Sequence, residues 1–120
     1  MTTTLPLTAA AYVESINNHD APAFIALFAE GALVNDAGRE HHGLGAIKQW
    51  SDHDIFEAQV TVDVIDVADR DGEVVITTKV DGNFDRTGLP DPLIMNHRLR
   101  TSGGKIVRLT CELATPDKPE

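Results

Sequence analysis

The sequence predicts one α+β domain, in which helices in the first half cover an antiparallel sheet formed by the second half. Up to about residue 50, apolar residues recur at the three- and four-residue spacing of amphipathic helices. After Ile55 they alternate with polar residues, as in strands. The 120 residues suffice for one buried core and are too few for two. We expect a single domain over residues 8–114, with frayed ends at 1–7 and 115–120.

Three helices are expected before the sheet. Thr8 is a suitable N-cap for the first helix, which runs to about Asn18. Asp20 caps the second helix, Pro22 lies in its first turn, and Gly31 ends it. The apolar side of this second helix consists of Phe24, Ile25, Leu27 and Phe28. A third helix of two to three turns is indicated by the helical spacing of Leu44, Ile47 and Trp50.

A short strand over residues 32–36 and a polar loop over 39–43 are expected between the second and third helices. The later strands are predicted at about 60–65, 74–80, 93–101 and 106–113. A hairpin turn is indicated at 69–72, and a longer loop with two prolines at 85–92. A long sheet twists and can curl, and a few short helices cannot fill its concave face. We therefore expect a cavity between the two layers that takes a small apolar molecule.

The composition excludes several classes of partner. The formal net charge is −9, and no stripe of Lys and Arg is present, so we expect no nucleic acid and no anionic membrane surface as partner. No apolar run is long enough to span a bilayer, and the N-terminus lacks a signal core, so we expect a cytoplasmic protein. The single cysteine, Cys111, lies in an apolar alternation and is expected to be a small buried hydrophobic residue.

Two polar residues are the first candidates for a site in the cavity. Tyr12 lies on the apolar face of the first helix, where its hydroxyl needs a partner: either a ligand or, more simply, a backbone carbonyl in the core. Asp36 follows an apolar strand and precedes Ala37 and Gly38. Its carboxylate either lines the mouth of a cavity or caps the turn through an Asx motif.

Three further residues could contribute to the cavity wall. Trp50 is either a core residue or one wall of the cavity. In the strand 93–101, the more apolar set of alternating residues includes His97, so this pattern places His97 inward and Asn96 outward, unless a bulge reverses them. An inward His97 is either a titrating group of the site or a structural histidine.

A metal site is not expected. The pair His41-His42 has Glu40, Asp36 and His53 near it in the sequence, but the spacing matches no established ligand pattern. A solvated loop explains these residues better.

The stretch from Tyr12 to Asp36 resembles the start of ketosteroid isomerases and SnoaL-type polyketide cyclases of the nuclear transport factor 2-like superfamily. The shared pattern is a helix with a tyrosine, a polar break ending in Asp20, a second helix ending in Phe-Ala-acidic, and a strand ending in aspartate. Segments 42–47 and 104–107 resemble the start of the family's third helix and its last hairpin. The likeness covers about residues 8–113.

The resemblance implies a cone-shaped α+β barrel, with three N-terminal helices packed on a strongly curved, mostly antiparallel sheet around a central pocket. It also implies a homodimer formed through the sheet. In the isomerases, the tyrosine matched by Tyr12 donates a hydrogen bond to the developing oxyanion, and the aspartate matched by Asp36 shuttles the proton. Their second, protonated aspartate has no match here. Its place holds Asn96 when counted from the last hairpin, and His97 or Met95 by apolar parity.

These features lead to two functional hypotheses. The first is a cofactor-independent isomerase or cyclase, in which Asp36 is the general base and Tyr12, with Asn96 or His97, stabilises an enolate oxygen. The residues expected to contact its small apolar substrate are Phe28, Trp50, Asn96 and His97. The second is a non-catalytic, ligand-binding or accessory dimeric domain of the same fold.

Overall fold

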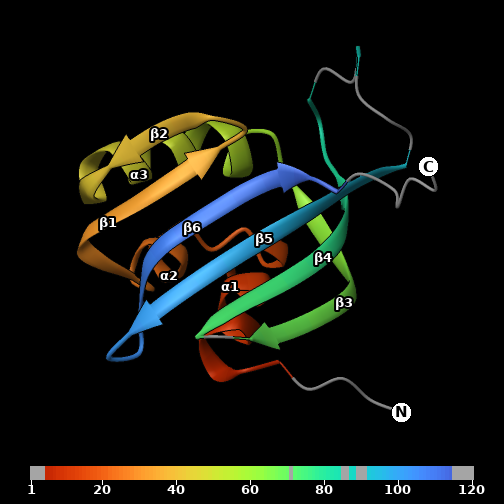
Figure 1. Ribbon diagram of the computed structural model, residues 1–120. Helices are drawn as coiled ribbons and strands as arrows, with labels where there is room; N and C mark the ends of the chain where they lie inside the picture. Colours follow the sequence, from red (N-terminus) through yellow and green to blue (C-terminus); the bar gives the residue numbers. More distant parts are fainter. Residues whose placement is uncertain (1–4, 71, 85–86, 89–91, 115–120) are drawn as a thin grey trace.

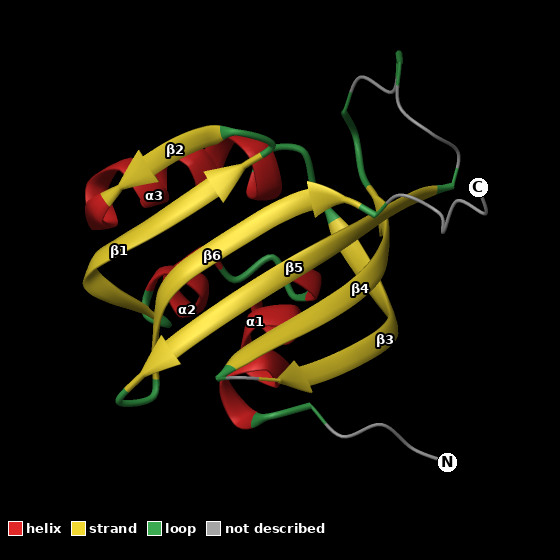
Figure 2. Cartoon of the chain, viewed as in Figure 1, coloured by secondary structure: helices red, strands yellow, loops and turns green. Residues whose placement is uncertain are grey.

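The computed structural model describes residues 5–70, 72–84, 87–88 and 92–114. They form two layers, a six-stranded sheet and a set of helices behind it (Figures 1 and 2). The elements in chain order are α1 (Leu7–Asn17), α2 (Ala21–Ile25), β1 (Phe28–Asp36), β2 (Arg39–His42), α3 (Gly43–Ser51), the π-helix η1 (Asp52–Phe56), β3 (Thr61–Arg70), β4 (Glu73–Asp81), β5 (Leu93–Ser102) and β6 (Lys105–Leu113). The predicted α+β class is confirmed.

The sheet is mixed and open. Its strand order is β2-β1-β6-β5-β4-β3, with β1 and β6 parallel and every other neighbouring pair antiparallel. The strands curve over α1 and α2, as Figure 1 shows. Because β2 and β3 remain unpaired edges of this sheet, the described strands do not close into the expected barrel. The parallel pairing of β1 with β6 joins the first half of the chain to the second half.

The second helix is shorter than predicted. The side chain of Asp20 accepts a hydrogen bond from the backbone N–H of Ala23, as expected of a cap, but α2 already ends at Ile25. The prediction that Gly31 ends this helix is wrong, because residues from Phe28 onward form β1. Phe28 pairs with Ile106 of β6, and the backbone N–H of Ile106 donates to the carbonyl of Leu27 at 2.8 Å. Pairing with a strand distant in sequence therefore overrides the local helical pattern.

The segment predicted as a polar loop is the edge strand β2. It pairs with β1 in an antiparallel hairpin whose turn is Ala37-Gly38, with φ angles of 52° and 90°. The side chain of Asn35 accepts a hydrogen bond from the N–H of Gly38 at 2.9 Å, which stabilises this turn. Because β2 is an exposed edge, its residues are polar, and no apolar alternation marked it as a strand.

Two other helical boundaries differ from the prediction. The first helix begins at Leu7 with Pro6 at its N-cap, and Thr8 instead donates its hydroxyl hydrogen to the carbonyl of Gly104. The third helix is present as α3, but the chain then continues as η1, which the sequence pattern did not indicate. β4, β5 and β6 lie where the alternation predicted them, whereas β3 continues to Arg70 and includes the first two residues of the predicted turn at 69–72. Most of the predicted loop at 85–92, and the tail from residue 115, lie outside the described residues.

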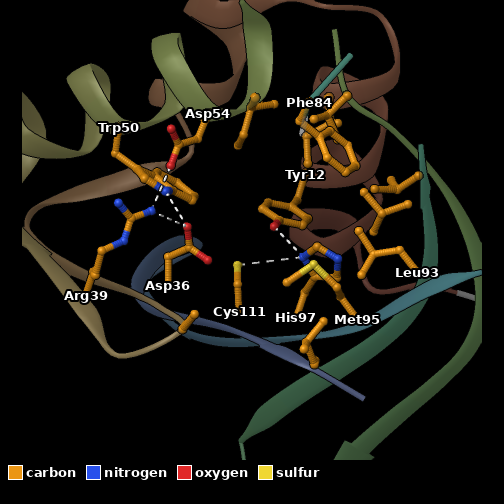
Figure 3. A pocket seen from close by; sticks show the side chains of 17 residues that line it. Tyr12, Asp36, Arg39, Trp50, Asp54, Phe84, Leu93, Met95, His97 and Cys111 are labelled. Atoms are coloured by element: carbon orange, nitrogen blue, oxygen red, sulfur yellow. Dashed lines mark hydrogen bonds and ion pairs between the residues drawn. The ribbon is translucent and has the colours of Figure 1, made fainter. Parts of the chain in front are cut away.

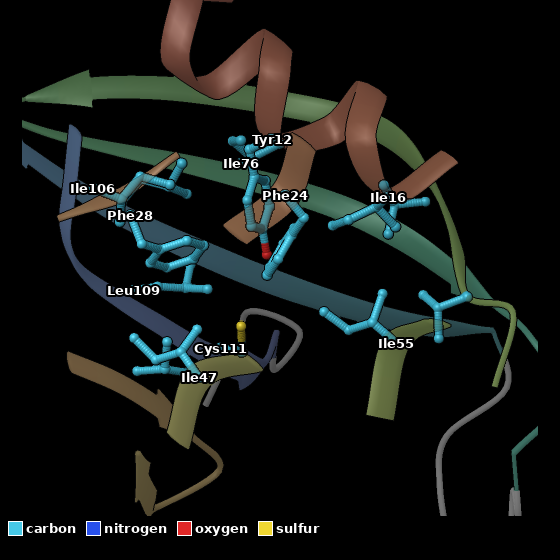
Figure 4. Close-up of a cluster of buried hydrophobic side chains, with 14 of the residues drawn as sticks. Tyr12, Ile16, Phe24, Phe28, Ile47, Ile55, Ile76, Ile106, Leu109 and Cys111 are labelled. Atoms are coloured by element: carbon cyan, nitrogen blue, oxygen red, sulfur yellow. The ribbon is translucent and has the colours of Figure 1, made fainter. Parts of the chain in front are cut away.

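The core fills the space between the helices and the sheet (Figure 4). Its fully buried side chains come from both layers and include Tyr12, Ile16, Phe24, Ile47, Ile76 and Leu109. Aromatic rings concentrate around Phe24, which contacts Tyr12, Phe28, Trp50 and Phe56. In the described part of the chain, no helix has the length and apolar character needed to cross a membrane.

Candidate functional site

A cavity of about 430 Å³ lies beside this core (Figure 3). Its walls are mainly apolar and include Ile16, Val60, Val62, Val80, Leu93 and Met95. The polar groups that line it gather in two places. Tyr12 and His97 lie on one side, whereas Asp36, Arg39 and Asp54 lie on the other (Figure 3).

Tyr12 is presented to the cavity by the inner face of α1, and only 1% of its surface is exposed. Its hydroxyl forms a 2.7 Å hydrogen bond with Nδ1 of His97 rather than with a backbone carbonyl. Burial raises the pKa of Tyr12 well above its ordinary value, and the neighbouring Cys111 and the charge of Asp36 raise it further. Tyr12 is therefore a neutral phenol at physiological pH.

His97 points inward from β5 and is also buried. Its Nε2 atom forms a 2.9 Å hydrogen bond with the hydroxyl of Thr78 on β4. Burial lowers the pKa of His97 from 6.5 to about 4, so the imidazole is neutral at physiological pH. The apolar alternation of β5 had placed His97 inward, and the structure agrees. Asn96 is not among the cavity residues, and its side chain accepts a hydrogen bond from Thr77 at 2.7 Å.

Asp36 ends β1 at the edge of the cavity, with 19% of its side chain exposed. Its Oδ2 atom accepts a 2.9 Å hydrogen bond from the indole N–H of Trp50 and lies 3.4 Å from the guanidinium of Arg39. Asp36 does not cap the following turn, since Asn35 does so. The backbone N–H of Ala37 donates to the carbonyl of Cys111 at 3.0 Å, which holds the end of β1 against β6.

Arg39 connects two carboxylates at this side of the cavity. Its guanidinium also contacts Oδ2 of Asp54 at 3.1 Å, and Asp54 in turn bonds to the exposed His53 at 2.7 Å. Arg39 itself is 66% exposed, so its charge is partly screened by solvent. The result is one arginine shared by Asp36 and Asp54 at the rim of an apolar cavity.

The remaining candidates have different positions. Trp50 lines the cavity, and its ring stacks on His41 with 5.8 Å between centroids. Phe28 is buried in the core against Phe24, with 5.1 Å between centroids, and is not a lining residue. Of the six residues predicted for the site, the structure thus brings Tyr12, Asp36, Trp50 and His97 to one cavity. It places Phe28 and Asn96 elsewhere.

The three histidines near Asp36 in the sequence each contact a different residue. His42 bonds to Glu40 at 3.2 Å, His53 bonds to Asp54, and His41 stacks on Trp50. Within the described ranges, no three His, Cys, Asp or Glu side chains come together in a geometry that could hold a metal ion.

The sequence patterns had not identified Arg39, Asp54, Thr78 or Cys111 as residues of this region. Thr78 lies in the inward alternation of β4, so that pattern contained a usable signal. Arg39 and Asp54 had none, because their approach depends on the β1–β2 hairpin and on η1. Cys111 is buried with Sγ 3.9 Å from Nδ1 of His97, and burial raises the pKa of its thiol. It is therefore a neutral thiol rather than a reactive thiolate.

Several known proteins are similar to this chain. A protein from Sinorhizobium meliloti, whose name proposes a polyketide cyclase, is 24% identical, with a TM-score of 0.80 over 90% of this chain and 95% of that one. A ketosteroid isomerase-like protein from Catenulispora acidiphila, solved with trimethylamine, is 24% identical, with a TM-score of 0.75 over 91% and 86% of the two chains. A computationally designed 17-OHP binder is 14% identical, with a TM-score of 0.73 over 88% and 87%.

At these identities the structural likeness concerns the fold alone. No curated protein sequence gave a match. The family model of the SnoaL-like domain matches residues 9–109, from within α1 to the middle of β6, and this range includes Tyr12, Asp36, Arg39, Asp54 and His97 of the cavity. With this match over most of its length, and with the nuclear transport factor 2-like fold of its structural neighbours, the chain belongs to the SnoaL-like domain family.

Proposed function

We propose that this domain is an enzyme that transfers a proton at a carbon atom next to a carbonyl group, as an isomerase or cyclase, without a cofactor. Its substrate is a small, mostly apolar compound. The observation that supports this proposal is that Asp36 and Tyr12, from β1 and α1, line one apolar cavity from opposite sides (Figure 3). A base and an oxyanion donor suffice for this class of reaction.

Asp36 is the general base in this proposal. Its Oδ2 atom is held by Trp50 and Arg39, which fix the orientation of the carboxylate. In the part of the chain that the structure describes, no hydrogen bond engages Oδ1, so this oxygen is available to accept a proton from the substrate. Fixing a reacting group in this way lowers the entropic cost of reaching the transition state.

Tyr12 stabilises the enolate oxygen. Because burial and nearby negative charge keep its phenol protonated, it can donate a hydrogen bond to charge that develops in the cavity. Such a donor contributes about 3 kcal/mol, or roughly a hundredfold in rate. His97, which bonds to Tyr12, is a neutral group at physiological pH and supports Tyr12 rather than adding a positive charge.

The test is deuterium exchange, which does not require the physiological substrate. A panel of cyclic ketones that includes 2-tetralone and 1-indanone is incubated with protein in D₂O, and loss of the proton next to the carbonyl is followed by NMR. We expect Asp36→Asn to abolish the protein-dependent exchange and Tyr12→Phe to slow it about a hundredfold. Asp63→Asn, on the exposed part of β3, is the matched control and should leave the rate unchanged. Wild-type exchange rates in Asp36→Asn would rule out Asp36 as the base.

A second candidate function is binding without catalysis. It is favoured by the contacts of Asp36 with Arg39 and Trp50, because a carboxylate held by two partners can act as a fixed structural group of a binding site. Neighbours of this fold include the complex with trimethylamine and the designed 17-OHP binder, so other proteins of this fold bind small molecules. Trp50 is the single tryptophan, and its fluorescence reports occupancy of the cavity. Saturable quenching by the ketones, without any exchange, would favour this second function.

We also propose that the domain forms a homodimer through the outer face of its sheet, as the family resemblance implies. Sedimentation velocity at micromolar concentration measures the mass directly. A monomer of 13.0 kDa throughout would contradict this proposal.

A further inference from the structure

Three buried polar side chains form one continuous chain of hydrogen bonds beside the cavity. The hydroxyl of Thr78 lies 2.9 Å from Nε2 of His97, and Nδ1 of His97 lies 2.7 Å from the hydroxyl of Tyr12. The exposed fractions of Thr78, His97 and Tyr12 are 1%, 6% and 1%. Of the three, Tyr12 and His97 line the cavity, whereas Thr78 lies behind them.

A neutral imidazole has one N–H group and one bare nitrogen, so the chain of hydrogen bonds can run in either of two directions. In one arrangement, Tyr12 donates to Nδ1 and Nε2–H donates to Thr78. In the other, Thr78 donates to Nε2 and Nδ1–H donates to Tyr12. The two arrangements place the free hydroxyl hydrogen at opposite ends of the chain. It belongs to Thr78 in the first case and to Tyr12 in the second.

The surroundings of Thr78 favour the second arrangement. Among the described residues, the only hydrogen bond of its hydroxyl is the one to His97. If Nε2–H donated to Thr78, the hydroxyl hydrogen of Thr78 would be buried without an acceptor, which is costly. The hydroxyl of Tyr12, by contrast, adjoins the cavity, where a ligand or water can accept its hydrogen. The thiol of Cys111 makes a longer and weaker contact with Nδ1, at 3.9 Å, than the hydroxyl of Tyr12 does at 2.7 Å.

We propose that Thr78 is a positioning residue that holds His97 as the Nδ1–H tautomer and so turns the hydroxyl hydrogen of Tyr12 into the cavity. The site then selects ligands that present a hydrogen-bond-accepting oxygen, such as a carbonyl or enolate, and rejects ligands that present only a donor. The selection rests on the proposed function, since it requires the cavity to be the ligand site. The assignment of the His97 tautomer does not depend on the proposed function.

The first experiment determines the tautomer in the complete chain. Long-range ¹H–¹⁵N correlation NMR distinguishes a protonated from a bare ring nitrogen, and the expected result at pH 7 is a protonated Nδ1 and a bare Nε2. The variant Thr78→Val removes the donor to Nε2 with little change of shape, and we expect protonation to shift toward Nε2. The variant Thr78→Ser keeps the hydroxyl and should restore the wild-type spectrum. Protonated Nε2 in the wild-type protein would overturn the inference.

The second experiment measures selectivity with two probes of similar size. 1-Indanone presents only an acceptor and indole only a donor, and both are titrated by quenching of Trp50 or by calorimetry. The measured quantity is the affinity for 1-indanone divided by the affinity for indole. We expect this ratio to be at least about fivefold lower in Thr78→Val than in the wild type, and to return to the wild-type value in Thr78→Ser.

An unchanged ratio in Thr78→Val would overturn the proposed selectivity. If neither probe bound while NMR showed a protonated Nδ1, the ligand site would be wrong and the tautomer assignment would stand. The two proposals therefore fail in distinguishable ways.

Discussion

At the scale of single residues, the most informative side chain is His97. It is one of the residues that the resemblance to ketosteroid isomerases matches to a second, protonated aspartate, yet it hydrogen bonds to Tyr12 and Thr78 and has no charge at neutral pH. A neutral imidazole between two hydroxyls accepts a hydrogen bond at one ring nitrogen and donates one from the other. It supplies no positive charge. In the proposed reaction, the charge on the oxygen would therefore be stabilised by hydrogen bonding rather than by a cation.

His97 should also make folding stability depend on pH. Its pKa is about 4 in the folded state and about 6.5 when unfolded, so the unfolded chain binds the extra proton between these values. The contribution of the neutral histidine to the free energy of unfolding is fully present above pH 6.5. It is lost as the pH falls toward 4. From this group alone we expect a loss of about 1.5 kcal/mol between pH 6.5 and pH 5.

Urea denaturation at several pH values measures this dependence. The carboxylates titrate in both proteins, so the comparison is between wild type and His97→Gln. Between pH 6.5 and pH 4, the free energy of unfolding should change less steeply with pH in the variant than in the wild type. The difference in slope corresponds to the one proton that unfolded His97 binds. Identical slopes would mean that His97 does not retain a lowered pKa in the folded protein.

At the scale of elements, the positions of most helices and strands follow from local apolar patterns, and each exception has an identifiable physical cause. The alternation of apolar residues predicted β4, β5 and β6, because each has one face against the core. It failed for β2, which is an edge strand, and for the start of β1, where pairing with β6 replaces a helical turn. The polar residues of β2 gave no apolar alternation to recognise, whereas at the start of β1 hydrogen bonding to the distant strand β6 outweighs the local helical preference.

The side chain of Asn17 links the end of α1 to β3 by two hydrogen bonds. Asn17, the last residue of α1, donates to the carbonyl of Val62 at 2.9 Å and accepts from its N–H at 2.8 Å. Val62 lies on the edge strand β3, whose outer side pairs with no other strand among the residues that the structure describes. We expect Asn17→Ala to lower the free energy of unfolding by about 2 kcal/mol, since two hydrogen bonds are lost.

The adjacent Asn18→Ala is the control for this junction. Asn18 is exposed, and its substitution should change stability by less than about 0.5 kcal/mol. Urea denaturation compares the two variants with wild type. Equal stability of Asn17→Ala and Asn18→Ala would show that the Asn17 contacts do not stabilise the junction.

At the scale of the whole molecule, β6 connects the two halves of the sheet. It pairs in parallel with β1 on one side and antiparallel with β5 on the other, so it joins Asp36 to the strand that carries His97. Leu109, near its centre, has an exposed fraction of 0%. The cavity therefore depends on this strand for the relative position of its two polar sides.

Shortening Leu109 should destabilise both halves together. We expect Leu109→Ala to cost about 3 kcal/mol, because it removes buried methyl groups and leaves a void. The exposed neighbour Arg108→Ala should change stability by less than about 0.5 kcal/mol. Far-UV circular dichroism reports the sheet and Trp50 fluorescence reports the site, and their urea transitions should coincide. Separate transitions would show that the halves unfold independently.

From the sequence alone, the α+β class, Tyr12 on the inner face of a helix, Asp36 at a strand end and the inward side of His97 could all be predicted. Each depends on a periodicity that is local in the chain, or on the family resemblance. The partners of these residues could not be predicted. The contacts of Asp36 with Arg39 and Trp50 require the β1–β2 hairpin. The contacts of His97 require the pairing of β4 with β5 and the packing of α1 against the sheet.

This difference has a physical reason. A repeating pattern of side chains fixes which face of a helix or strand is buried, since burial of apolar surface acts on each element separately. A hydrogen bond between elements depends on register and crossing geometry to within a few tenths of an ångström, and only the packed molecule sets these. The tyrosine and aspartate could thus be named in advance, whereas the hydrogen bonds that link Tyr12 to His97 and His97 to Thr78 are visible only in the folded structure.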